Sequence, residues 1–168
     1  TISHCANNYG PYQFPEKVIP LFTTNALEGK PLPLFKSSQN RREWIHVDDH
    51  ARAIDLILHR GRIGEDYNVG TLTEKSVEDI ADAVLMHLEK SSALKTYVPD
   101  RLQHDRRYVL DPTKIQEELG WAPEVPFDRG IRETVFWYRD NPEWWQRCKS
   151  GEYQKYYEGY YQDRIGRL

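Results

Sequence analysis

Residues 6–17 constrain the fold of this chain most, because they dictate a tight connection between a strand and a helix. Residues 1–5 are typical of a strand, and a helix is expected over residues 16–27. Two asparagines, one glycine and two prolines between them favour turns, and three aromatic residues are interleaved with these turn-formers. Asparagine amides both donate and accept hydrogen bonds, so this loop can bind a polar ligand. The alternative is a rigid turn whose aromatic side chains fill a core.

Short strands and helices alternate along the rest of the chain, which predicts an α/β fold. The clearest helix is expected at residues 77–88, where apolar residues recur at three- and four-residue spacing, and Ser76 with Asp79 resembles a capping box. Another helix is expected from Asp48 and Asp49, which would cap its start, through Ala51, Ile54, Ile57 and Leu58. The other expected elements are strands at 31–35, 43–47, 66–69 and 94–98, a polar loop at 36–42, and helices at 112–119 and from Asp128 to a break at Asn141–Pro142.

Length and charge exclude several classes of function. The 168 residues suffice for one domain, and a net charge of -3 with a pI near 6.1 argues against a dedicated nucleic-acid binder. Cys5 and Cys148 lie too far apart for a disulfide framework or a metal motif, which fits a reducing cytoplasm. No apolar run reaches transmembrane length. The sequence therefore predicts a cytoplasmic protein with no membrane partner.

Because residue 1 falls inside a strand, we expect the chain to be part of a longer polypeptide.

Two polar clusters each have a structural and a functional interpretation. His46, Asp48, Asp49 and His50 are metal-ligand types, but acids at a strand-to-helix junction are more often helix caps, which contribute roughly 1 kcal/mol. No metal site is therefore predicted. Arg42 lies either in a solvated basic loop or in a site where its planar guanidinium meets two oxygens of a diphosphate.

Residues 7–17 read Asn-Asn-Tyr-Gly-Pro-Tyr-Gln-Phe-Pro-Glu-Lys, and this run resembles the signature of the dTDP-glucose 4,6-dehydratases. These enzymes belong to the extended short-chain dehydrogenases/reductases. The resemblance implies that Asn7, Lys17 and Val18 contact the substrate and that Asn8 lies against the NAD cofactor.

Two further segments carry the same resemblance. Arg42-Glu43-Trp44 is similar to an Arg-Asp-Trp run of the family, which implies that Arg42 contacts the diphosphate. Residues 100–108 are similar to Asp-Arg-Pro-Gly-His-Asp-x-Arg-Tyr, which implies that Arg101 and His104 contact the substrate. Leu102-Gln103 stands in place of Pro-Gly, so the loop that carries His104 loses a turn preset by proline and can be reshaped.

Pro33, Leu34 and Phe35 match the stretch that lines the nucleotide in this family, and the ring of Phe35 is expected to stack on the base. The family often has an asparagine where this chain has Val77, so that substrate contact is expected to be absent and Val77 to belong to the core.

The motifs of the family's other half do not occur in these 168 residues. There is no Gly-x-x-Gly-x-x-Gly, no Tyr-x-x-x-Lys and no Thr-Asp-Glu. In the family these bind NAD, supply the base and drive loss of water, so no catalytic residue is assigned here. The resemblance thus implies a C-terminal substrate-binding lobe of mixed short strands and helices, with the NAD-binding Rossmann core largely missing. Residues 1–168 would form one such domain, to which residues 1–15 and about 43–70 contribute the last elements of the cofactor domain.

The implied function is the sugar-nucleotide-binding part of an NAD-dependent lyase that converts dTDP-glucose to its 4-keto-6-deoxy product. NAD is expected to be bound mainly outside this chain, the chain alone to be inactive, and a homodimer to form through helices that it lacks. The alternatives are an epimerase or decarboxylase of the same superfamily, or a non-catalytic module that binds carbohydrate or protein with its Tyr- and Trp-rich tail.

Overall fold

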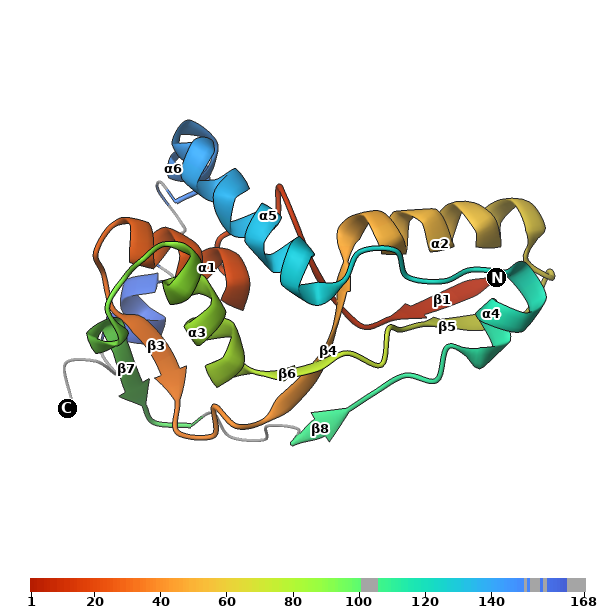
Figure 1. The fold of residues 1–168 in the computed structure, drawn as a ribbon, viewed down its shortest axis with the longest axis horizontal. Helices are drawn as coiled ribbons and strands as arrows, with labels where there is room; N and C mark the ends of the chain where they lie inside the picture. The colour runs from red at the N-terminus through yellow and green to blue at the C-terminus, as the bar shows by residue number, and fades with distance from the viewer. Residues whose placement is uncertain (101–105, 150, 152–154, 156, 163–168) are drawn as a thin grey trace.

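The computed structural model describes residues 1–100, 106–149, 151, 155 and 157–162 of the chain. They form an elongated α/β structure with one packed group of helices and strands at each end (Figure 1). The fold class expected from the alternating pattern is confirmed. No helix in the described ranges combines the length and the apolar character that a membrane crossing requires.

At one end, helices pack over a pair of parallel strands (Figure 1). The strands are β3 (Leu32–Phe35) and β7 (Lys95–Val98), and the helices are α1 (Val18–Leu27), α3 (Val77–His87) and α5 (Phe127–Asp140). The buried cluster between them consists of Tyr9, Ile19, Leu21, Phe22, Ala26, Leu32, Leu34, Trp44, Ile80, Ala81, Val84, Leu85, Ile131 and Val135.

At the other end, a second pair of parallel strands is covered by helices (Figure 1). The strands are β1 (Ile2–Cys5) and β5 (Asp66–Val69), and the helices are α2 (Val47–Arg60) and α4 (Thr113–Leu119). The buried cluster here consists of Ala6, Ile45, Ala53, Ile57, Tyr67, Val69, Ile115, Leu119 and Trp121. This cluster draws on residues 1–15 and 43–70, but their assignment to a cofactor domain stays a prediction.

Strand β4 (Arg41–His46) joins the two ends. It pairs with β2 (Asn7–Tyr9) and β8 (Arg107–Tyr108) in parallel and with β6 (Glu74–Ser76) in the antiparallel sense. Trp44 on β4 packs in the first cluster and its neighbour Ile45 in the second, because successive side chains of a strand point to opposite faces. The remaining elements are α6 (Pro142–Cys148), a short 3-10 helix (Ser92–Leu94) and a short π-helix (Glu158–Gln162).

Two of the local signals for helix ends are confirmed, while α1 begins at Val18 rather than at residue 16 and α4 begins at Thr113 rather than at residue 112. Ser76 accepts a hydrogen bond from the Asp79 amide and Asp79 accepts one from the Ser76 amide, which completes the capping box. Helix α5 ends at Asp140, and α6 starts at Pro142. The prediction that Asp48 and Asp49 cap α2 is wrong. The cap is His46, whose Nδ1 accepts from the Asp48 amide at 3.3 Å, so the imidazole serves as the helix cap.

Three short strands were not predicted, namely β2, β6 and β8. Each has two or three residues, too few for a periodic pattern, and each is defined by its pairing with β4. The polar loop expected to reach Arg42 is also shorter than predicted, because β4 already begins at Arg41.

Candidate functional site

A cavity of about 640 Å³ lies where β2, the start of α1, β3 and β4 meet. Seven residues predicted to bind substrate or cofactor line it: Asn7, Asn8, Lys17, Val18, Pro33, Phe35 and Arg42. The other lining residues are Cys5, Ala6, Gln13, Glu16, Leu21, Phe22, Trp44, Val77 and Tyr160. The structure therefore gathers into one cavity seven predicted residues from three separate segments of the sequence.

Three predicted site residues are not part of this lining. Leu34 is fully buried, and its side chain lies in the core between α1, α3 and β3, on the other side of the strand from the side chains of Pro33 and Phe35. Arg101 and His104 lie outside the described residues.

The cavity lining includes two cationic side chains, the exposed Lys17 and the half-buried Arg42. Lys17 Nζ lies 2.8 Å from the Glu16 carboxylate, and the Lys17 side chain is 60% exposed. An ion pair this exposed is worth little, so the ammonium group can turn toward an anionic ligand at small cost. With Arg42 on β4, the lining offers two cations beside apolar surface from Phe22, Phe35 and other residues. This combination suits a small molecule with phosphate groups and a flat, partly apolar part.

The loop before α1 is held in shape by distant aromatic residues. Tyr12 adopts a left-handed backbone conformation (φ 63°), and its ring lies 4.5 Å from that of Trp137, centroid to centroid. Tyr138 donates a hydrogen bond to the carbonyl of Gln13 at 2.5 Å, while the Gln13 amide donates to the carbonyl of Asn8 at 2.8 Å. Helix α5 thus fixes the loop that supplies the polar lining of the cavity. The loop is therefore not a purely core-filling turn, because some of its side chains pack against α5 and others line the cavity.

Asn7 and Asn8 make their contacts on different elements. The Asn7 Oδ1 accepts a hydrogen bond from the Tyr108 hydroxyl on β8 at 2.6 Å. The Asn8 amide donates to the Ala6 carbonyl and to Cys5 Sγ, and its Oδ1 lies 2.8 Å from His50 Nδ1 on α2. These internal bonds of Asn8 support a structural role, so its contact with NAD stays a prediction.

His50 has one imidazole nitrogen without a partner. Its Nε2 is buried and makes no hydrogen bond within the described part of the chain. Burial lowers the pKa of His50, so the ring is neutral near pH 7, and Nδ1 carries the proton because the Asn8 oxygen accepts it. Nε2 is then a buried acceptor beside the cavity-lining Asn8.

Sequence reasoning missed several lining residues. Glu16 and Gln13 belong to the recognised loop and could have been found from it. Tyr160 reaches the cavity from the π-helix near the end of the chain, and no local sequence pattern predicts this contact. Val77 packs against the first core, as expected, and also lines the cavity.

Glu43 is a fully buried carboxylate at the centre of the site's scaffold. Its Oε1 accepts hydrogen bonds from the backbone amides of Thr71 and Leu72 at 2.5 and 2.7 Å, and its Oε2 accepts from that of Leu110 at 2.8 Å. A Cβ at Gly70 would lie 2.5 Å from Oε1, so this close approach requires glycine. Glu43 therefore ties β4 to the turn before β6 and to the segment after β8.

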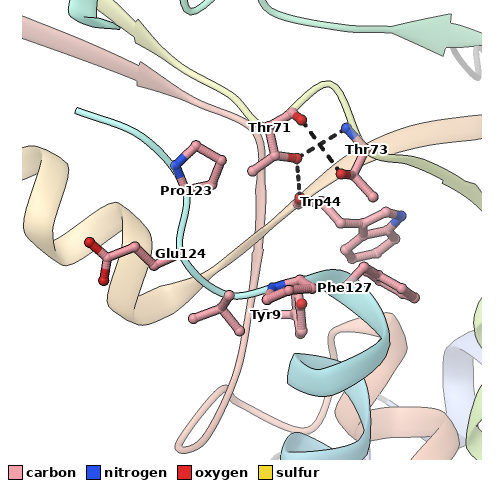
Figure 2. A pocket seen from close by; sticks show the side chains of 9 residues that line it. Tyr9, Trp44, Thr71, Thr73, Pro123, Glu124 and Phe127 are labelled. Atoms are coloured by element: carbon pink, nitrogen blue, oxygen red, sulfur yellow. Dashed lines mark hydrogen bonds between the residues drawn. The ribbon is translucent and has the colours of Figure 1, made fainter. Parts of the chain in front are cut away.

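Trp44 also lines a second, smaller pocket of about 140 Å³ (Figure 2). The Tyr9, Trp44 and Phe127 rings gather on one side of it, and the Thr71 and Thr73 side chains lie on another (Figure 2). Residues 123–127 complete the wall. This pocket borders the site, since Trp44 lines both spaces.

Asp49 holds that wall in place. Its fully buried carboxylate accepts hydrogen bonds from the Glu124 amide at 2.9 Å, the Val125 amide at 3.0 Å and the Arg52 guanidinium at 2.5 Å. Burial by itself would raise the pKa of Asp49, but the Arg52 side chain and the two backbone amides outweigh it, so the pKa is lowered.

This lowered pKa predicts a pH-dependent contribution to stability. The contribution is present above the unfolded-state pKa of 3.8 and is lost as pH falls through the lower folded-state value. We expect Asp49→Asn to lower the free energy of unfolding near about pH 7, and the difference from the unmodified chain to shrink below about pH 4. Urea titrations between about pH 7 and pH 3 measure this difference in the free energy of unfolding. A difference that stays constant with pH would contradict the assignment.

The comparisons with known proteins first define a class. The crystal structure of DesIV, a dTDP-glucose 4,6-dehydratase from Streptomyces venezuelae solved with NAD bound, is similar with a TM-score of 0.86 at 48% identity, over 88% of this chain and 46% of that chain. UDP-glucose 4-epimerase from Thermotoga maritima, solved with UDP-glucose, is similar with a TM-score of 0.78 at 31% identity, over 83% of this chain and 46% of that chain. The fold is thus part of an extended short-chain dehydrogenase/reductase.

The family follows from the sequence. The family model described as GDP-mannose 4,6 dehydratase matches residues 1–134, and the chain belongs to this family. Among curated relatives, the dTDP-glucose 4,6-dehydratase of Streptomyces niveus is 50% identical over 149 residues, which cover 89% of this chain and 44% of that protein. The resemblance stated from residues 7–17 is confirmed. The chain spans about half the length of the curated relatives it matches.

Proposed function

We propose that this chain supplies the sugar-nucleotide-binding part of an NAD-dependent dTDP-glucose 4,6-dehydratase. One observation carries the proposal: the cavity of about 640 Å³ is lined by seven of the residues that the family resemblance assigns to ligand. Its volume falls within the range of roughly 300–1,000 Å³ that is usual for small-molecule sites.

Each lining group has a role that its chemistry supports. Arg42 would hold the diphosphate, because a guanidinium meets two phosphate oxygens at once, and Lys17 would add a second cation. Phe35 would stack on the pyrimidine, and Asn7 would contact the sugar nucleotide. None of these groups takes part in bond breaking, so the lobe binds and orients the substrate.

NAD, when bound, would accept a hydride from the sugar and return it after water is lost. The residues of this chain fit only the edge of such a site. Cys5 and Asn8 line the cavity beyond the carboxyl end of parallel strand β1, which is where dinucleotides bind in α/β sheets. No glycine-rich fingerprint occurs in the sequence, so we place most of the NAD site in polypeptide outside this chain.

Among the described residues of the tail, Trp145 gives little support to a carbohydrate- or protein-binding module. Trp145 and Tyr138 are buried, and the Trp145 indole donates to the Tyr138 carbonyl at 2.8 Å. These aromatic residues serve packing. The epimerase alternative differs in the nucleotide it would take, so a comparison of ligands distinguishes it.

The test is calorimetric titration of the chain with dTDP-glucose and, separately, with UDP-glucose. We expect dTDP-glucose to bind more tightly, and Arg42→Ala to weaken it about tenfold or more, because a charge-assisted hydrogen bond is lost. Arg62→Ala is the matched control, since Arg62 is exposed, pairs with Glu118 at 3.5 Å and does not line the cavity. Tighter binding of UDP-glucose would favour the epimerase. Equal losses in both variants would contradict the role of Arg42.

A further inference from the structure

We propose that Tyr108 is a positioning residue that holds Arg42 and Asn7 in the arrangement that binds the sugar nucleotide. The inference rests on the proposed function. Tyr108 is not among the described residues that line the cavity, yet it contacts two that do. Its hydroxyl donates to Asn7 Oδ1 at 2.6 Å, and the guanidinium carbon of Arg42 lies 5.0 Å from the centre of its ring.

The contact with Asn7 engages the oxygen of its amide group. An asparagine amide has one accepting oxygen and one donating nitrogen, and the two exchange places when the side chain turns over. Because the oxygen accepts from Tyr108, Asn7 keeps its NH₂ group for the ligand; among the described residues that group makes no hydrogen bond. Asn7 is thereby set as a donor, which suits a hydroxyl of the sugar.

The contact with Arg42 fixes the place of its charge. The guanidinium lies over the electron-rich face of the Tyr108 ring, and its Nη1 donates to the carbonyl of Arg41 at 2.8 Å. These two contacts restrict a long side chain that would otherwise sample many rotamers. A cation already placed at the cavity loses less conformational entropy when an anionic ligand binds.

Tyr108 is itself held from both sides. Strand β8 pairs with β4 so that Tyr108 lies opposite Arg42. Before it, Arg107 makes two hydrogen bonds of 2.6 Å to the Glu74 carboxylate, and after it the Leu110 amide donates to the buried Glu43 at 2.8 Å. The ring therefore reaches Arg42 and Asn7 from a fixed support.

Two substitutions separate the two contacts. Tyr108→Phe keeps the ring and removes only the hydroxyl, so we expect dTDP-glucose to bind about three- to tenfold more weakly while the affinity for dTDP, which lacks the sugar, is unchanged. Tyr108→Leu also removes the ring and should weaken both ligands. Calorimetric titration of the chain measures all four affinities. Tyr97→Phe is the control, since Tyr97 is similarly exposed and its hydroxyl donates to Glu78 at 2.8 Å away from the cavity lining.

A double-substitution cycle gives the decisive readout. If Tyr108 acts through Asn7, then Tyr108→Phe has no further effect on dTDP-glucose binding once Asn7→Ala is present. Additive losses, or an unchanged affinity in Tyr108→Phe, would overturn the inference while leaving the proposed function intact. Equal losses for both ligands in Tyr108→Phe, with a lower melting temperature, would assign a merely structural role. Failure of the unmodified chain to bind either ligand would instead overturn the proposed function, and this inference with it.

Discussion

Incubated with NAD and dTDP-glucose, the 168-residue chain is expected to form no 4-keto product above a protein-free blank. The sequence lacks the three motifs that the family resemblance links to NAD binding, to the base and to loss of water, so nothing positions a hydride acceptor against the substrate. Enzymes of ordinary power accelerate their reactions at least about 10⁶-fold, so the expected difference from an active protein is very large. Turnover by the chain alone would contradict its assignment as the binding part only.

Activity should return when the missing machinery is supplied. The design joins the part of the Streptomyces niveus relative that precedes the matched region to Thr1 of this chain; the match covers 44% of that relative. We expect this protein to form the 4-keto product. Arg42→Ala within it should raise KM about tenfold with little change in kcat, because Arg42 is assigned to the diphosphate, remote from the reacting carbons. A joined protein that binds NAD and remains inactive would contradict the proposed function.

Glu43→Gln is expected to destabilise the folded chain strongly. The carboxylate is fully buried and accepts three backbone hydrogen bonds, two on Oε1 and one on Oε2. Glutamine keeps one accepting oxygen but turns an NH₂ group toward a backbone N–H, which leaves donors unpaired in the interior. We expect the free energy of unfolding to fall by about 2–4 kcal/mol.

Urea denaturation, followed by the fluorescence of the five tryptophans, measures this loss. Glu65→Gln is the control, because Glu65 is half exposed and pairs with Lys114 at the surface, and its unfolding midpoint should not move. Glu43→Asp keeps the charge but is one methylene shorter, so an intermediate loss is expected. A midpoint unchanged in Glu43→Gln would show that the three hydrogen bonds contribute little.

Signals within a few residues determined the local elements. Ser76 and Asp79 form their capping box three residues apart, and Asn141–Pro142 separates two helices. The same holds for much of the site, because Asn7, Asn8 and Lys17 belong to one short run whose chemistry can be recognised without knowing the fold. These two signals act between residues a few positions apart, so the sequence alone was enough to predict them.

Only the tertiary structure decided which side chains meet. Asn7 and Tyr108 are 101 positions apart, and the contact between them depends on two- and three-residue strands that exist only by pairing with β4. Glu43 stands beside arginines in a polar stretch, where an acid is usually solvated, yet it is fully buried by partners 28 to 67 positions away. Leu34 was predicted to contact the ligand but lies in the core. Side chains alternate along β3, so Leu34 points away from the cavity that its neighbours Pro33 and Phe35 line. Long-range pairing and burial depend on the whole packed chain, and no local pattern encodes them.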